Sequence, residues 1–237
     1  MKQTVTRLLS ISLFALLFAS GCHSNKQQAV VEAPPAYQPT PVSAPISLPA
    51  TVAAAPKLTE VQDAVRRIFK DAAVIDNSHN PSFVAGDFNG DASEDIAIVV
   101  KPAKLEEMNQ ELPPWLLREP RVNHTKPVRL KILKDEKLLA VIHGFGDNSW
   151  RDPEATQTFV LKNVVGNDIK VQSGKEFVEA NAGRKLPRPK GDLIGQNLQG
   201  TNGYLYFAVS TYAWYDPKTF NDAQDAPGVF HRARTMR

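Results

Sequence analysis

The stretch Asp95-Ile-Ala-Ile-Val-Val-Lys101 is the part of the sequence that decides the fold. Its apolar run from Ile96 to Val100 is rich in β-branched residues, which favour extended backbone. The run is apolar at every position rather than at alternate ones, which is typical of a strand buried on both faces. We therefore predict a central β-strand here, with further strands around it.

Strand signals continue on both sides of this run. A short apolar segment at 82–86 precedes it, and three pairs of apolar segments follow it, each pair separated by a turn-like stretch. The predicted pairs are 128–133 with 138–143, 158–164 with 168–171, and 192–194 with 204–209. The first two pairs are predicted to be hairpins.

A helix is predicted ahead of these strands. Apolar residues recur there at helical spacing, at Leu58, Val61, Val65, Ile68, Phe69 and Ala72. One helix followed by hairpins indicates an α+β fold in which the helix packs on a mainly antiparallel sheet. We place this domain at 57–217, and about 160 residues suffice for a single hydrophobic core without disulfides.

The first 21 residues have the features of a secretory signal peptide. Lys2 and Arg7 are their only charged residues, and an apolar run covers 8–18. This run is shorter than the roughly 20 apolar residues that span a bilayer. Small residues at 19–21 then lead to Cys22, the only cysteine in the chain.

The segment Ala19-Ser20-Gly21-Cys22 resembles the lipobox of bacterial lipoproteins. The resemblance implies cleavage before Cys22 and attachment of diacylglycerol and a fatty acid such as palmitate. Several acyl chains give a stable membrane anchor, whereas one does not. His23 takes the place of the aspartate that retains lipoproteins in the inner membrane, which favours the outer membrane of the cell envelope. The alternative is an ordinary secreted protein with an unmodified cysteine.

Two segments outside the predicted domain lack periodic apolar residues. Residues 22–56 contain seven prolines and are predicted to be a disordered linker, with a proline-rich ligand for a partner as the alternative. Residues 218–237 are polar and are predicted to be a disordered tail. The formal charge is +3, and removal of the two positive charges of the signal leaves +1. This charge gives no reason to expect a nucleic-acid partner.

The segment 86–96, Gly-Asp-Phe-Asn-Gly-Asp-Ala-Ser-Glu-Asp-Ile, carries oxygen-bearing side chains at alternate positions. In a tight loop, alternate side chains can point to a common centre, and calcium prefers six to eight oxygen ligands. The candidate metal ligands are Asp87, Asn89, Asp91, Ser93 and Asp95, with Ser93 contributing its carbonyl. The alternative is a turn rich in Asp, Asn and Gly that only connects two strands.

This loop resembles the calcium loop of FG-GAP and VCBS-type repeats, Asp-x-Asp/Asn-x-Asp-Gly-x-x-Asp between two strands. Asp87, Asn89, Asp91 and Asp95 match it, whereas Ala92 replaces the usual glycine. There is one copy, so a propeller is not implied. Together with Lys190-Gly191-Asp192 before an aromatic strand, the chain resembles bacterial envelope lipoproteins that carry a single such module and have no assigned activity. The resemblance implies location and a structural calcium ion, not a reaction.

No catalytic residue is assigned from the sequence, and we expect a non-enzymatic binding or adhesion module. Trp150, after the glycine-rich segment 144–149, and Trp214 are candidates for a ligand-binding lip, with turn and core positions as the alternative. The expected partners are a membrane, through the lipid, and an envelope glycan or protein. Two other functions stay open: a hydrolase of envelope glycans or peptides, and a docking subunit of an envelope complex.

Overall fold

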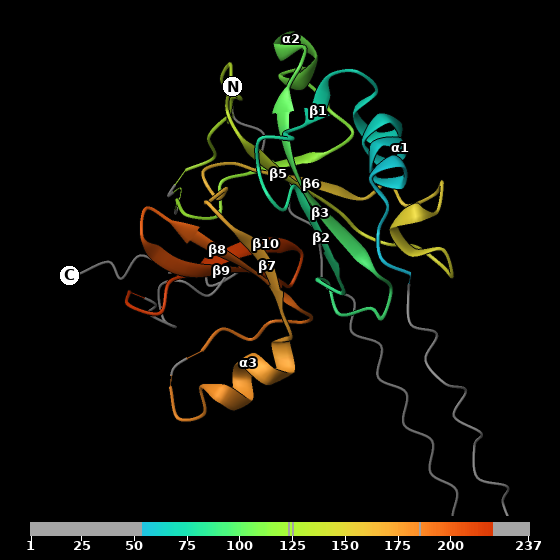
Figure 1. Cartoon of the computed structure of the whole chain (residues 1–237). Coiled ribbons are helices and arrows are strands. Elements are labelled where there is room, and N and C mark those ends of the chain that lie inside the picture. The colour runs from blue at the N-terminus through green and yellow to red at the C-terminus, as the bar shows by residue number, and fades with distance from the viewer. Residues whose placement is uncertain (1–53, 123, 125, 185, 220–237) are drawn as a thin grey trace, which may run out of the picture. The chain divides into compact units, whose positions relative to one another are not determined.

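A computed structural model of the chain describes residues 54–122, 124, 126–184 and 186–219 (Figure 1). The described residues belong to the compact unit Thr51–Arg237. The predicted signal peptide, Cys22, nearly all of the linker and most of the tail lie outside the described residues. Among the described helices, none has the length and apolar character needed to cross a bilayer.

The first sheet has six strands in the order β1-β3-β5-β6-β4, with β2 also paired to β3. Its strands are β1 (Ala73–Ile75), β2 (Phe83–Gly86), β3 (Asp95–Pro102), β4 (Leu116–Arg118), β5 (Leu138–Ile142) and β6 (Thr158–Leu161). All pairs are antiparallel except β4 with β6. The strands β1 and β2 pair with successive halves of one edge of β3, which makes β3 the central strand.

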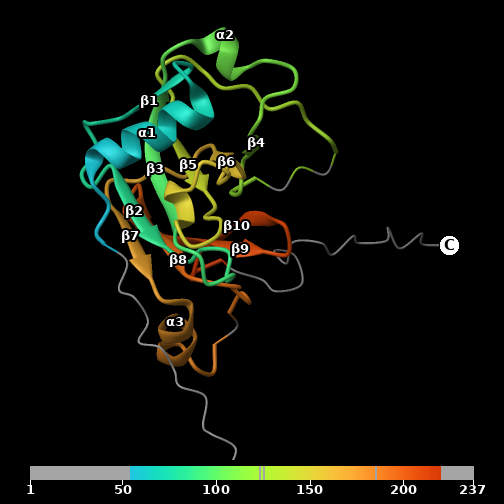
Figure 2. The same ribbon diagram turned by 90° about the vertical axis from the view of Figure 1, so that its right-hand side faces the viewer.

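The second sheet has four antiparallel strands in the order β10-β9-β8-β7. They are β7 (Ile169–Gln172), β8 (Leu193–Leu198), β9 (Thr201–Ala208) and β10 (Thr211–Tyr215). The helices are α1 (Leu58–Phe69), α2 (Leu105–Met108) and α3 (Gly174–Ala180), with a 3₁₀ turn η1 at Ser149–Arg151. Figure 2 and Figure 1 both place α3 beside this sheet, on the side away from α1.

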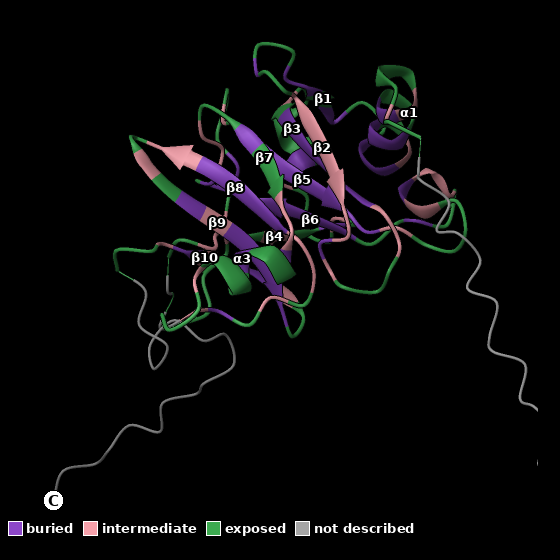
Figure 3. Ribbon diagram, turned by 60° about the horizontal axis from the view of Figure 1, so that its bottom comes forward, coloured by how far each residue is buried: buried purple, intermediate pink, exposed green. Residues whose placement is uncertain are grey.

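The two faces of β3 belong to two different hydrophobic clusters. Ile96 and Ile98 lie in a cluster with α1 residues, whereas Ala97 and Val99 lie in a cluster with residues of the second sheet. Successive side chains of a strand point to opposite faces. A strand with a cluster on each face must therefore be apolar at every position, and Figure 3 shows β3 buried along most of its length.

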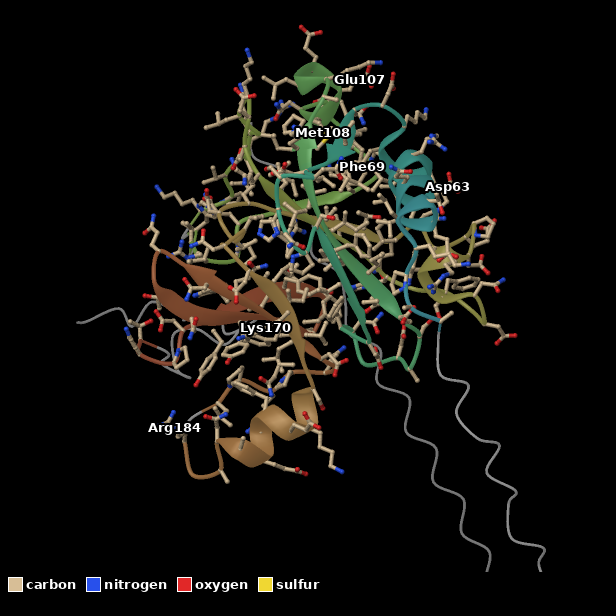
Figure 4. The ribbon with its side chains drawn as sticks, viewed as in Figure 1. Asp63, Phe69, Glu107, Met108, Lys170 and Arg184 are labelled. Atoms are coloured by element: carbon tan, nitrogen blue, oxygen red, sulfur yellow. The ribbon has the colours of Figure 1, made fainter. Side chains whose placement is uncertain are left out.

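Helix α1 has one buried face and one exposed face. Phe69 of α1 is buried in the first cluster, together with Met108 of α2. The side chain of Asp63, also on α1, is 72% exposed and points outward (Figure 4). A third, smaller cluster joins Phe177 of α3 to Tyr206 and Tyr215 on the outer face of the second sheet.

The structure confirms a mixed fold made mostly of strands with few helices, but with two sheets where one was predicted. The hairpin predicted at 128–133 and 138–143 is wrong, because no strand forms at 128–133 and β5 pairs with β3 and β6. Val128 and Leu133 are 56% and 64% exposed, so the apolar residues of this segment do not form a buried strand face.

The hairpin predicted at 158–164 and 168–171 is also wrong. Both segments contain strands, but β6 belongs to the first sheet and β7 to the second. The last predicted pair is confirmed, since β8 and β9 are antiparallel neighbours.

Candidate cation-binding loop

The predicted calcium loop connects β2 to β3 and is closed by its own polar side chains. Gly90 and Ala92 adopt left-handed backbone, with φ of 76° and 69°. Glycine adopts such a φ at no steric cost, whereas alanine is disfavoured there by roughly 1 to 2 kcal/mol. The loop therefore keeps a strained alanine in the place where the resembling loops have glycine.

Asp87 binds the backbone of the residues that follow it. Its Oδ1 accepts hydrogen bonds from the amides of Gly90 at 2.7 Å and Asp91 at 3.1 Å, and its Oδ2 accepts one from Ala92 at 2.9 Å. An anionic acceptor makes stronger hydrogen bonds than a neutral one. This carboxylate therefore fixes the first turn of the loop.

Asn89 and Asp91 continue the same pattern one step further. The Oδ1 of Asn89 accepts from the Asp91 amide at 2.9 Å, and its Nδ2 donates to Asp91 Oδ2 at 2.8 Å. The Oδ1 of Asp91 accepts from the Ser93 amide at 2.8 Å. The structure thus brings together the alternate side chains that the sequence singled out, bound to loop amides.

Asp95 is the buried end of the loop, with 0% of its surface exposed. Its Oδ2 accepts from the amides of Phe88 at 2.8 Å and Asn89 at 3.1 Å, and its Oδ1 accepts from Gly144 at 2.7 Å. Burial raises the pKa of Asp95 to about 7, because loss of hydration disfavours the charged form more than the three amide donors favour it.

The loop is also held by the second sheet, through a residue that was not predicted as part of the site. The amide of Asp192 donates to the carbonyl of Asp87 at 2.6 Å, and the amide of Asp87 donates to Asp192 Oδ2 at 3.3 Å. A Cβ on Gly191 would lie 2.1 Å from the Asp87 carbonyl oxygen, so only glycine allows this approach. Burial, and next the charge of Asp87, raise the pKa of Asp192. One signal in the sequence could have indicated Asp192: it is an acidic residue that follows Gly191 directly before a strand.

Four aspartates of this region have no cationic partner within the described part of the chain. None of the ion pairs found there involves Asp87, Asp91, Asp95 or Asp192, whereas Glu94 pairs with Arg151 at 2.9 Å. No group of three or more His, Cys, Asp or Glu side chains among the described residues is arranged to hold a metal ion. A cation at this loop would therefore share oxygens that accept backbone hydrogen bonds.

His143 precedes Gly144, whose amide binds Asp95 of this loop, and its side chain has a structural role. Its Nδ1 lies 3.0 Å from Gln157 Oε1 and its Nε2 lies 2.9 Å from Tyr212 Oη. The ring packs against Phe159 and Phe207, and burial lowers the pKa of His143. Both ring nitrogens have protein partners, so this histidine is a satisfied core residue.

The structure separates the two tryptophans suggested as a ligand-binding lip. Trp150 has 0% of its surface exposed, and its indole Nε1 donates to Glu94 Oε2 at 2.8 Å. This burial corrects the prediction for Trp150, because a side chain without exposed surface cannot contact a ligand. Trp214, on β10, is only partly buried, and the Arg121 guanidinium carbon lies 5.6 Å from its ring centroid.

Comparison with protein-family models, with curated proteins and with solved structures finds no match to this chain.

Proposed function

We propose that the protein is a non-enzymatic binding module of the bacterial cell envelope whose acidic loop holds a structural calcium ion. The observation that carries the calcium proposal is the group of aspartates at 87, 91, 95 and 192, which has no cationic partner within the described residues. The charge of Asp91 repels that of Asp95, and the charge of Asp87 repels that of Asp192. A divalent cation would remove that repulsion.

The donor set fits calcium in its chemistry. Asp87, Asn89 and Asp91 supply side-chain oxygens, the Ser93 carbonyl is a further candidate, and Asp95 closes the loop. Each carboxylate oxygen has more than one lone pair, so an oxygen that accepts a backbone hydrogen bond can still bind a cation. The ion would supply charge neutralisation where the two sheets meet, and we assign it no part in a reaction.

The test of the calcium proposal is thermal unfolding of the purified protein in chelator and then in millimolar calcium. At a calcium concentration of about 100 times Kd, the native state gains about 2.7 kcal/mol, so we expect Tm to rise by about 5 to 10 °C. Asp91→Asn removes a charge but keeps a carbonyl acceptor, and we expect it to abolish most of this rise.

Asp147→Asn is the matched control, because Asp147 is exposed and lies outside the loop. It should keep the full response to calcium. If wild-type protein melts at the same temperature in chelator and in calcium, and elemental analysis finds no bound calcium, the loop is only a hydrogen-bonded connection.

The anchor is the second part of the proposal. The support for it is the sequence alone: a signal peptide that ends in the lipobox-like Ala19-Ser20-Gly21-Cys22, with no other cysteine in the chain. We propose that lipid on Cys22 holds the protein at a membrane, with the outer membrane favoured by His23.

We expect Cys22→Ser to move the protein from the membrane fraction to the soluble fraction. Two or more acyl chains anchor a protein stably, and serine offers no thiol for the lipid. Fractionation with detergent phase partitioning and intact-mass measurement checks this. Ser20→Ala, which keeps a small residue before the cysteine, is the control. A Cys22→Ser protein that still partitions into detergent would disprove the lipid anchor.

We also propose that residues 57–217 form a single domain in which α1 packs on the six-stranded sheet. The support is the hydrophobic cluster that joins Val61 and Phe69 to Ile98 and Ala140, and the cluster shared by the two sheets.

A further inference from the structure

A groove lies at one end of the second sheet. None of the described residues that line it belongs to the acidic loop at 87–95. Its volume is ≈ 560 Å³, and ligand sites usually measure about 300 to 1,000 Å³. It is bordered by the β6–β7 connection, by the β8–β9 turn and by Arg121 with Val122. Its polar lining residues are Arg121, Asn163, Asn167, Asn197 and Gln199.

The floor of the groove is fixed from behind by buried groups. The amide of Gly166 donates to Gln196 Oε1 at 2.9 Å, and His79 Nε2 lies 2.7 Å from the Gly166 carbonyl oxygen. A Cβ on Gly166 would lie 2.2 Å from the carbonyl oxygen of Asn197. These contacts hold the β6–β7 connection against β8 in one arrangement. The entropy lost when a ligand binds is therefore smaller.

Gln196, next to the lining residue Asn197, carries an unused donor. Its side chain is only 2% exposed, and its Nε2 has no hydrogen-bond partner among the described residues. A buried amide donor without a partner costs about 1 to 3 kcal/mol. Gln196 is not among the residues that line the groove, so this donor stabilises no ligand contact there.

Arg121 is the only charged residue among the described residues that line the groove. Its guanidinium lies over the Trp214 ring, and its Nη1 donates to the carbonyl of Asn163 at 3.5 Å. Within the described residues, Arg121 forms no ion pair, since Glu119 is engaged with Asn163 and His124. Arg121 therefore offers the groove one guanidinium that can donate two parallel hydrogen bonds to a carboxylate.

We propose that this groove binds an acidic saccharide, a sugar unit that carries a carboxylate on or beside its ring. Side-chain amides offer both donors and acceptors to vicinal hydroxyl groups. Val165 and Leu198 offer apolar surface to the C–H face of a sugar ring. Arg121 selects the carboxylate. The inference rests on the proposed binding role but not on the calcium loop, and it names the ligand class for that role.

The test uses the full protein, calcium-loaded, with an oligogalacturonate as the probe and its uncharged methyl ester as the matched neutral saccharide. Trp214 is the only tryptophan that is not buried, since Trp115 and Trp150 are 4% and 0% exposed. We expect the acidic probe to change Trp fluorescence and the ester to bind about tenfold more weakly or worse, because a charge-assisted hydrogen bond is lost.

Arg121→Gln should weaken binding of the acidic probe by about tenfold or more and leave the affinity for the ester unchanged. Arg118→Gln is the matched control, because it removes the same charge three residues away on the exposed edge of β4. Equal loss in both variants would mean non-specific attraction and would overturn the proposal. So would binding of an acidic peptide with no binding of the saccharide.

A separate measurement distinguishes failure of this inference from failure of the proposed calcium site. If calcium raises Tm and the saccharide does not bind, the groove is wrong and the loop stands. If the saccharide binds with the same affinity in chelator and Tm ignores calcium, the groove stands without the calcium site.

Discussion

Asp95→Ala is expected to lower the free energy of unfolding by about 3 to 5 kcal/mol. The change removes the carboxylate that accepts from the Phe88, Asn89 and Gly144 amides, and Asp95 itself has 0% of its surface exposed. Each buried donor left without a partner costs about 1 to 3 kcal/mol. Urea unfolding in chelator measures the effect without any contribution from calcium.

The matched variants are Asp95→Asn and Asp147→Ala. Asparagine keeps one acceptor oxygen, so we expect a smaller loss than with alanine. Asp147 is exposed, so its replacement should change stability by no more than about 0.5 kcal/mol. A loss below about 1 kcal/mol for Asp95→Ala would show that Asp95 does not tie the loop to Gly144.

The pH dependence of wild-type and Asp95→Asn protein in chelator gives a second measurement on the same residue. The pKa of Asp95 is about 7 in the folded protein against 3.8 for the free side chain, so the folded state binds the proton more tightly. The resulting stability is fully present below about pH 4 and is lost as pH rises through about 7. Wild-type protein should therefore gain stability relative to Asp95→Asn as pH falls from about 7.5 to about 5.

His143 contributes in the opposite direction, because burial lowers its pKa and its charging costs stability below about pH 6.5. It is present in both proteins, so the difference between them isolates Asp95. A flat difference over this pH range would mean that Asp95 stays ionised when folded.

The sequence contained most of what fixes the centre of the fold. The run at 96–100 predicts a strand buried on both faces, and β3 has that place because one cluster lies on each side of it. The alternate spacing of Asp87, Asn89 and Asp91 predicts oxygens that converge on one cation, and this stays a prediction. The structure shows these side chains hydrogen-bonded to loop amides.

The local pattern of apolar residues could not predict which strands, distant in sequence, pair with each other. The segment at 128–133 alternates apolar and basic residues as a strand does, yet only Ile132 is buried there. The chain passes from the first sheet to the second between β6 and β7, and a short connection suits both a hairpin and a change of sheet. Only the packing of both sheets around residues such as Phe159 and Ile169 decides between them.

The groove could not be found from the sequence for a related reason. Arg121 and Gly166 come from two separate loops and Asn197 from strand β8, and none belongs to a spacing that indicates binding. Trp150 shows the opposite error. A tryptophan after a glycine-rich turn reads as exposed, but its partners Arg67 and Glu94 come from the helix and from the acidic loop, far away in sequence.

Trp150→Ala is expected to destabilise the protein by about 3 to 5 kcal/mol, which for a domain of this size lowers Tm by about 10 °C or more. Among the described residues, Trp150 has the largest volume of the fully buried side chains, so replacement by alanine leaves a large cavity. The change also removes the indole donor to Glu94 Oε2 at 2.8 Å and the ring over which the Arg151 guanidinium carbon lies at 4.1 Å from the centroid.

Trp150→Phe and Trp214→Phe separate this role from ligand binding. Phenylalanine at 150 fills much of the cavity, and Glu94 keeps Arg151 at 2.9 Å, so about half of the loss should be recovered. Trp214→Phe should leave Tm nearly unchanged, because Trp214 is only partly buried. If Trp150→Ala instead abolished saccharide binding while Tm stayed at the wild-type value, Trp150 would belong to a ligand site, and its burial between α1 and the acidic loop would have to open in solution.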